Sequence, residues 1–300
     1  MSTKSPEPAE APGSSSTTEE KSGRHILGLV EEQVSLGPRV PGSTAHGQLQ
    51  ELLESRLRRF ASEVVRQEFR VTLRGQSVDC ANLVGVFRAA RPDGDPILLG
   101  THFDTRPRAD RDADPVQRDA PIPGANDGGS GTAVFEHMLP WLSQQQLTRD
   151  VVVAFFDAED LGNIDGNEFS MGAEWYACHP PRGAIPAEVV ALDMVGGKEM
   201  VFDIDAHISI FPAEKLLTLE MFRLGTSHGW RPFSADKPQK VKYIVSDHHP
   251  FARRGIPSCL LIDLDYPQWH TQADTPQAMS AASLGITEAI LSLYLSRFQA

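Results

Sequence analysis

The chain has 300 residues, 40% of them hydrophobic, and a formal net charge of −12 at pH 7. A chain of this length can bury one sizeable hydrophobic core, so we expect one folded domain rather than two. The acidic balance disfavours a nucleic-acid partner, because binding to phosphates needs a basic surface. No apolar run approaches the roughly 20 residues that cross a membrane, so we expect no membrane span.

The amino-terminal segment predicts a disordered tail. Residues 1 to about 24 are rich in Ser, Pro, Glu and Thr and contain almost no apolar side chains. Such a segment cannot offset the conformational entropy lost on ordering, so we expect 1–24 to be disordered and 25–300 to fold. The sequence as written also lacks the apolar stretch of a signal peptide, which predicts a cytoplasmic protein, or an exported one if the start is misassigned.

The first regular elements are a helix and two strands. Apolar residues recur at three-to-four spacing from about 46 to 67, which predicts an amphipathic helix. Apolar and polar residues then alternate over 69–73, and a second short run rich in β-branched residues covers 82–87. Both runs are typical of strands.

Strands and helices alternate along the rest of the chain. Continuous apolar runs, typical of strands buried on both faces, occupy 97–99, 151–156, 189–192 and 259–262. The clearest helical stretches cover about 130–146, 213–228 and 281–298. The alternation predicts an α/β fold, a three-layer sandwich in which helices cover both faces of a mostly parallel central sheet.

Polar residues follow these apolar runs, where open α/β sheets bind their ligands beyond the carboxyl ends of the strands. A glycine-rich turn, GANDGGSG, leads into a helix and can present a carboxylate to the same edge. The residues are His102 and Asp104 after the first run, Glu159 and Asp160 after the second, Asp193 after the third, His270 after the fourth, and Asp127 in the turn. We therefore expect them to converge.

Each group alone has an ordinary structural explanation. A histidine beside an aspartate is commonly a hydrogen-bonded pair, adjacent carboxylates commonly begin a helix, and glycine serves any turn that needs positive φ. Together, however, His, Asp and Glu form the ligand set of catalytic zinc, which takes three protein ligands and leaves one position open. Asp160 can bind the metal while Glu159 beside it moves protons as a general base. Asp104 can orient His102 or the neighbouring backbone.

With these residues in place, the chain resembles the zinc aminopeptidase superfamily (peptidase M28), which includes di-zinc aminopeptidases and animal-type glutaminyl-peptide cyclotransferases. Residues 37–43 (GPRVPGS) resemble the G-P-R-x-x-G-S opening of these enzymes, and the later motifs follow in the family's order up to about 297. The resemblance implies a zinc aminopeptidase-like fold and a single catalytic domain over 25–300.

The resemblance also implies roles for the polar residues. Asp127, Asp160 and His270 would hold the zinc common to both branches, with Glu159 as the proton shuttle. In an aminopeptidase, His102 and Asp193 would complete a second zinc site. In a cyclotransferase one zinc is used, and Asp193 instead joins Asp247 in a hydrogen-bonded acidic network.

Three features resemble the cyclotransferase branch. The acidic pair is followed by a long insertion, LGNIDGNEF; residues 246–257 (SDHHPFARRGIP) are similar to the cyclotransferase D-H-x-P-F-x-x-R-G-V-P stretch; and Trp269, before His270, can cover a substrate side chain. Two positions differ: residues 162–165 lack the tryptophan of the vertebrate enzymes, and Asp160 stands where many relatives have Glu.

The leading hypothesis is therefore zinc-dependent cyclisation of the N-terminal glutamine of a peptide or protein to pyroglutamate, with release of ammonia. The alternative is a di-zinc aminopeptidase that hydrolyses N-terminal residues, with Glu159 activating a bridging water. A third reading is a non-catalytic interaction protein of the same fold. The intact set of ligand residues argues against this third reading.

Overall fold

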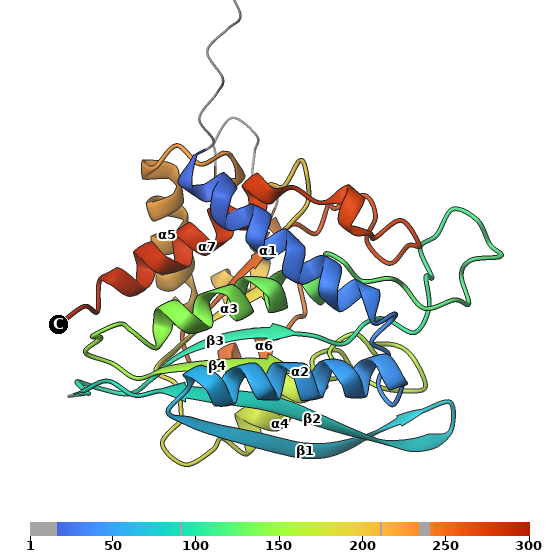
Figure 1. Cartoon of the computed structure of the whole chain (residues 1–300), viewed down its shortest axis with the longest axis horizontal. Coiled ribbons are helices and arrows are strands. Elements are labelled where there is room, and N and C mark those ends of the chain that lie inside the picture. The colour runs from blue at the N-terminus through green and yellow to red at the C-terminus, as the bar shows by residue number, and fades with distance from the viewer. Residues whose placement is uncertain (1–16, 91, 211, 234–240) are drawn as a thin grey trace, which may run out of the picture.

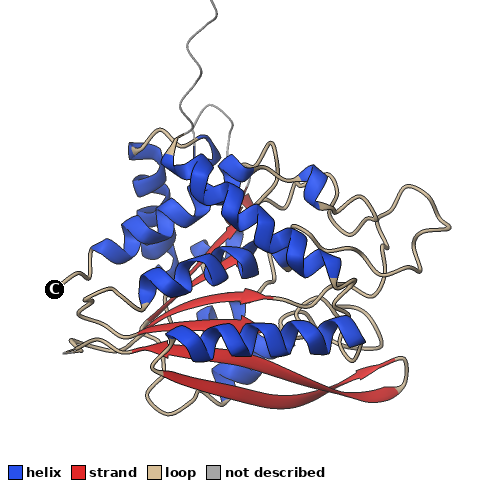
Figure 2. Ribbon diagram, viewed as in Figure 1, coloured by secondary structure: helices blue, strands red, loops and turns tan. Residues whose placement is uncertain are grey.

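The computed structural model describes residues 17–90, 92–210, 212–233 and 241–300, and its centre is a six-stranded sheet (Figures 1 and 2). In spatial order the strands are β1 (Glu63–Leu73), β2 (Gln76–Phe87), β4 (Val151–Phe156), β3 (Ile97–His102), β5 (Glu188–Asp193) and β8 (Ser258–Ile262). The last four strands run parallel, whereas β1 and β2 are added antiparallel at one edge. The prediction of a mostly parallel sheet is confirmed.

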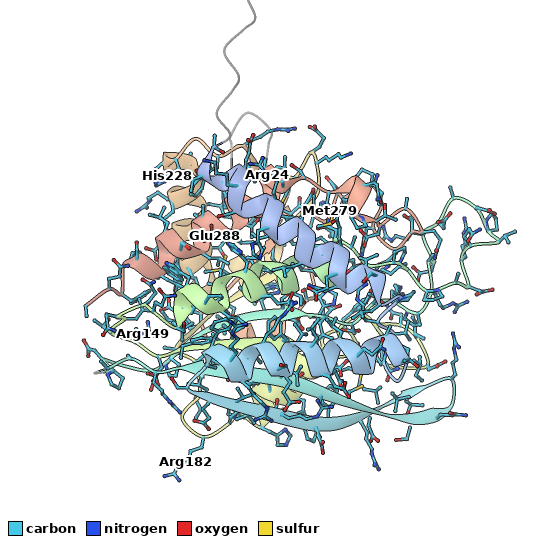
Figure 3. All side chains as sticks on the ribbon, in the orientation of Figure 1. Arg24, Arg149, Arg182, His228, Met279 and Glu288 are labelled. Atoms are coloured by element: carbon cyan, nitrogen blue, oxygen red, sulfur yellow. The ribbon has the colours of Figure 1, made fainter. Side chains whose placement is uncertain are left out.

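Helices cover both faces of this sheet. Alternate residues of each buried strand enter different cores, because successive side chains of a strand point to opposite faces. In β4, Val151, Val153 and Phe155 belong to one core, and Val152, Ala154 and Phe156 to the other. The first core is covered by α1 (Thr18–Ser35), α2 (Thr44–Phe60), α3 (Gly129–Leu142), α5 (Pro212–Ser227) and α7 (Ala281–Ser296). The second is covered by α4 (Met171–Cys178) and α6 (His249–Ala252). Side chains fill both interlayer spaces (Figure 3), which confirms the three-layer sandwich.

The first predicted helix is shorter than its apolar pattern suggested. Helix α2 ends at Phe60, and strand β1 begins at Glu63, opposite Val86 of β2. Val64 continues the helical spacing by coincidence, but it pairs with Gly85 across the sheet. Tertiary pairing with β2 therefore overrides the local helical pattern.

The prediction of a disordered tail up to residue 24 is wrong at its end. Helix α1 begins at Thr18, and the hydroxyl of Thr17 accepts a hydrogen bond from the backbone N–H of Glu20. The helix packs so closely on α7 that a Cβ on Gly23 would clash with the carbonyl oxygen of Ala281, at 1.7 Å. Docking onto a distant helix stabilises a segment whose composition alone predicted disorder. Residues 1–16 of the predicted tail lie outside the described residues.

The connections on the carboxyl side of the parallel strands carry most of the irregular structure. The segment between β3 and α3 makes a long excursion, drawn in green at the right of Figure 1. A two-stranded parallel pair, β6 (Ile204–Asp205) and β7 (Val241–Lys242), and three short 3₁₀ turns follow β5. Among the described helices, none is both long and apolar enough to span a membrane.

Candidate metal centre and active site

Two groups of metal-binding side chains meet at the carboxyl ends of the parallel strands. One group is Asp127, Asp160 and His270, and the other is His102, Asp127 and Asp193. Within each group one ligand atom per residue lies within 4.8 Å of the others. All five side chains are buried, so the structure brings the sequence-predicted residues together and gives Asp127 a place in both groups.

The first group has unsatisfied ligand atoms. Nε2 of His270 lies 3.2 Å from Oδ1 of Asp160 and 3.5 Å from Oδ2 of Asp127. Oδ2 of Asp127 and Oδ2 of Asp160 are buried without a hydrogen-bond partner among the described residues. A buried carboxylate oxygen without a partner destabilises the folded protein, so these atoms fit a bound cation. Two carboxylates with one imidazole are a ligand set that suits zinc.

The ionisable side chains of this group shift one another's pKa values. Burial and the nearby Asp160 carboxylate together raise the pKa of Asp127 to about 6, although His102 and His270 act to lower it. Burial lowers the pKa of His270, but the carboxylates of Asp160 and Asp110 overcome this effect and raise it to about 9. A divalent cation among these carboxylates would relieve their mutual repulsion.

The second group lies on the other oxygen of Asp127. Nε2 of His102 is 3.4 Å from Oδ1 of Asp127 and 3.4 Å from Oδ1 of Asp193. The other oxygen of Asp193 accepts a hydrogen bond of 3.1 Å from the Ser246 hydroxyl. Asp127 thus turns one oxygen toward each histidine, an arrangement that can bridge two metal ions.

Glu159 is a buried carboxylate beside these groups. It lines the same pocket as Asp127, Asp160, Asp193 and His270 and is only 4% exposed. The hydroxyl of Ser170 donates a 3.1 Å hydrogen bond to its Oε1. Burial raises the pKa of Glu159 well above its ordinary value. The nearby His102 acts to lower this pKa, and the carboxylate of Asp247 acts to raise it. A buried carboxylate with a raised pKa suits proton transfer near neutral pH.

Asp104 fixes the turn that carries the acidic pair. Its two carboxylate oxygens accept hydrogen bonds from the backbone N–H groups of Glu159, at 3.0 Å, and Asp160, at 3.1 Å. Its Oδ1 is also 3.6 Å from Nδ1 of His102. The turn includes Ala158 at a positive φ of 56°. Asp104 therefore orients neighbouring backbone, one of the two roles predicted for it.

The glycine-rich turn is held in the same way by residues that sequence reasoning missed. Asp274 accepts hydrogen bonds from the backbone N–H groups of Asn126 and Asp127 and from the Tyr266 hydroxyl. The fully buried guanidinium of Arg39 donates to the carbonyl oxygens of Pro123 and Gly124. In the sequence, the one indication of a structural role for Arg39 was its position within the GPRVPGS motif.

Asp110 is a further missed residue, and it orients a proposed metal ligand. Its Oδ1 lies 3.2 Å from Nδ1 of His270, and Arg106 donates to its Oδ2. Arg106 also donates to Asp160, so one network holds two members of the first group. A carboxylate behind a histidine fixes the ring and raises its basicity. Nothing in the sequence distinguishes this Asp from others in the same long loop.

We expect Asp110→Asn to weaken zinc binding by about 10- to 100-fold, because the amide holds the His270 ring less firmly and lowers its basicity. Competition with a chromophoric chelator measures the affinity. Asp119→Asn serves as a control, because Asp119 is exposed on the same loop and pairs with Arg108. Unchanged affinity in Asp110→Asn would show that the histidine is held by other contacts.

Asp247 does not form the predicted hydrogen-bonded network with Asp193. Its side chain is buried, but both oxygens lack a hydrogen-bond partner among the described residues, and the preceding Ser246 binds Asp193 instead. Burial raises the pKa of Asp247 well above its ordinary value. The nearby His102 acts to lower this pKa, and the carboxylate of Asp193 acts to raise it. Two carboxylates repel each other, so the neutral hydroxyl is the better partner for Asp193.

Apolar side chains line the pocket beside these acids. Trp269 lines it as predicted, together with Phe169, Ile244 and Leu264. Phe169 was missed; it supplies an aromatic ring although residues 162–165 contain none. The guanidinium carbon of Arg111 lies 3.7 Å from the centre of the Trp269 ring, which favours one orientation of the indole.

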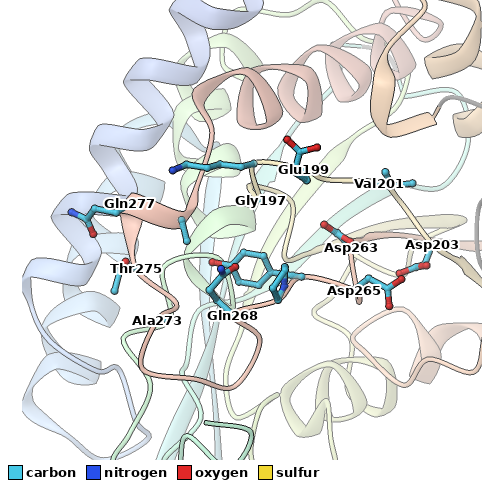
Figure 4. Close-up of a pocket in the computed structure, with 14 residues that line it drawn as sticks. Gly197, Glu199, Val201, Asp203, Asp263, Asp265, Gln268, Ala273, Thr275 and Gln277 are labelled. Carbon is cyan, nitrogen blue, oxygen red and sulfur yellow. The ribbon is translucent and has the colours of Figure 1, made fainter. Parts of the chain in front are cut away.

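A separate cavity of about 730 Å³ lies along the loop that leads to Trp269 (Figure 4). Asp203, Asp263 and Asp265 gather on one side of it. Lys242 forms ion pairs with Asp203 and Asp265. Burial and these two neighbours raise the pKa of Asp263 to about 7.

We expect Asp263→Asn to flatten the pH dependence of stability. The folded pKa of about 7 exceeds the unfolded value of about 3.9, so this carboxyl contributes stability that is lost as pH rises from about 4 through 7. After discounting for solvent, the variant gains about 2 kcal/mol relative to wild type between pH 4 and pH 8. Urea unfolding at both pH values measures the change, with exposed Asp95→Asn as control. Equal pH dependence in the variant and wild type would contradict this expectation.

The fold and site define a metallo-exopeptidase class, and comparison with known proteins identifies the family. Residues 82–295 match Peptidase family M28, so the chain belongs to that family. The chain is 24% identical over 303 residues to a "Glutaminyl-peptide cyclotransferase-like protein" of Mus musculus, covering 87% of this chain and 72% of that protein. The corresponding Bos taurus protein is 23% identical over 291 residues.

Solved structures of two kinds share the fold. A Zn-dependent exopeptidase from Parabacteroides distasonis superposes with a TM-score of 0.81 and 27% identity, covering 91% of this chain and 97% of that one. A glutaminyl cyclase from Porphyromonas gingivalis gives a TM-score of 0.83 and 26% identity, covering 92% and 98%. The chain is thus an enzyme of family M28 whose fold is similar to those of zinc exopeptidases and of glutaminyl cyclases.

Proposed function

We propose that the protein is a zinc-dependent glutaminyl-peptide cyclotransferase, which converts the N-terminal glutamine of a peptide to pyroglutamate. The observation that carries the proposal is the pocket itself. Glu159 lines it together with the group of Asp127, Asp160 and His270 and with the aromatic residues Trp269 and Phe169. The similarity to solved glutaminyl cyclases supports it.

The three residues of the first group would hold the zinc, since their unpartnered oxygens and imidazole nitrogen converge. When bound, zinc polarises the side-chain carbonyl of the substrate glutamine. Asp110 and Arg106 keep His270 and Asp160 in place for this task.

The protein's own groups then handle the protons and the geometry. The substrate's α-amine attacks the side-chain carbonyl carbon, a new C–N bond forms, and the bond to the amide nitrogen breaks. Glu159 takes a proton from the amine and passes it to the departing nitrogen, which leaves as ammonia. Trp269 and Phe169 hold the side chain folded and exclude water, so that proximity favours the intramolecular reaction. Asp193 and Asp247 hydrogen-bond the amine and the reacting amide.

One observation favours a second candidate. His102, Asp127 and Asp193 form another group that can bind a metal, and Asp127 can bridge both sites. With two zinc ions the same residues suit an aminopeptidase, in which Glu159 takes a proton from the attacking water. Both reactions act on a peptide or protein with a free amino terminus.

The deciding experiment incubates the zinc-loaded protein with one peptide that begins with Gln and one that begins with Leu. We expect the Gln peptide alone to lose the mass of one ammonia molecule, as read by mass spectrometry. Release of free amino acids would instead identify an aminopeptidase. No reaction with either peptide would leave an interaction protein of this fold as the better reading.

A further inference from the structure

A second groove adjoins the catalytic pocket on the side of α4 and α6. It is a cavity of about 760 Å³ bordered by β1, the loop at residues 166–170 and these two helices. Phe169 and Val245 line both this groove and the catalytic pocket, so the two spaces are adjacent. Ser170, which donates a hydrogen bond to Glu159, also lines the groove.

The groove presents apolar surface close to the pocket. The ring of Trp175 stacks near Phe69, with centroids 6.0 Å apart, and near His179, with centroids 4.2 Å apart. Trp175 remains 38% exposed and Val245 48% exposed. Exposed large apolar side chains that gather at a concave surface indicate a binding site.

The charged side chains of the groove are mostly neutralised. Glu174 accepts hydrogen bonds from both Arg253 and Arg254, and Arg70 pairs with Asp79. Burial and neighbouring positive groups lower the pKa of His249 to about 4, so its ring is neutral at pH 7. This surface therefore suits an apolar ligand group better than a charged one.

We propose that this groove, lined by Trp175, Phe69 and Val245, binds the side chain of the second residue of the substrate peptide and prefers an aromatic or large apolar one. The proposal rests on the proposed function only in requiring a peptide substrate. Consecutive Cα atoms are 3.8 Å apart. The second residue of a peptide whose first side chain reaches Glu159 is then within reach of Phe169, which lines both the pocket and the groove.

The alternative is that the peptide runs over the cavity of Figure 4, which Asp203, Asp263 and Asp265 make acidic. The segment from Leu264 to Trp269 lies between that cavity and the catalytic pocket: Leu264 and Trp269 line the pocket, and Asp265 lines the cavity. No lining residue is common to both spaces. A substrate that ran over the acidic cavity would favour a basic second residue, which gives the test a clear opposite outcome.

The experiment measures binding to the zinc-loaded full chain carrying Glu159→Gln, in which turnover is expected to be about 10²- to 10⁴-fold slower. The ligands are Gln-Phe-Ala, Gln-Gly-Ala and Gln-Lys-Ala, titrated by calorimetry. We expect Gln-Phe-Ala to bind about tenfold more tightly than Gln-Gly-Ala, from the apolar area buried. Equal Kd values for these two peptides, or tightest binding of Gln-Lys-Ala, would overturn the proposal.

Adding Trp175→Ala is expected to remove most of the preference for Phe over Gly. Trp141→Ala is the matched control, because Trp141 is also partly exposed but lies on α3, in a different cavity. Val245→Ser, a milder change at an exposed position, repeats the test if Trp175→Ala unfolds. A preference that survives both groove variants contradicts the proposal. If wild type fails to cyclise glutamine yet Gln-Phe-Ala still binds more tightly, the groove stands and the proposed function falls.

Discussion

Replacing Glu159 with glutamine is expected to lower kcat for glutamine cyclisation by about 10²- to 10⁴-fold, the usual contribution of a general base. The amide is nearly isosteric but cannot take the proton from the attacking amine. It can still accept the hydrogen bond from Ser170. Zinc content should be unchanged, because Glu159 belongs to neither group of metal-binding residues.

The measurement is the rate of ammonia loss by mass spectrometry, together with elemental analysis of zinc. Glu51→Gln is the matched control, because Glu51 is exposed on α2, away from the pocket and the groove. Activity that persists in Glu159→Gln would refute the assignment of the base. Loss of both zinc and activity would instead show that Glu159 supports the metal site.

Removing zinc with a chelator is expected to abolish activity, and one equivalent of zinc per chain should restore it. His270→Ala should weaken zinc binding by more than the 10- to 100-fold that loss of an outer-shell partner costs, because the imidazole contributes to the first group. His102→Ala should keep one zinc with near-normal affinity, because His102 belongs only to the second group.

Zinc titration of the apoprotein separates the two candidate reactions. Restoration of activity that needs two equivalents, with one lost in His102→Ala, would support the aminopeptidase. Asp127 is common to both groups, so Asp127→Ala should remove all zinc under either reading.

The sequence predicted the parts of the site that follow strands directly. Strands buried on both faces read as unbroken apolar runs, so their ends, and the polar residues after them, are easily located. His102, Glu159, Asp160 and Asp193 were found in this way, and the structure brings them together. The locations of these residues depend only on where each strand stops and on the strands being parallel.

The residues that were missed act across long sequence separations. Asp274 holds the turn at Asp127 from almost 150 positions away, and Phe169 enters the pocket from an irregular loop. No local periodicity marks such residues, because packing of distant loops decides their contacts. The expected hydrogen bond between Asp193 and Asp247 is absent for a related reason: the sequence does not show that the Ser246 hydroxyl, and not Asp247, is the partner of Asp193.

The crossing of α1 and α7 carries a consequence for synthesis and folding. Gly285 meets the backbone of Glu19 as Gly23 meets that of Ala281, so the two helices contact through positions about 260 residues apart. Closing so long a loop is entropically costly and kinetically slow. During synthesis α1 can meet α3, through the hydrogen bond of Gln33 to Glu136, well before α7 has left the exit tunnel. The part of its apolar face that α7 covers stays exposed until then, a state that chaperones protect.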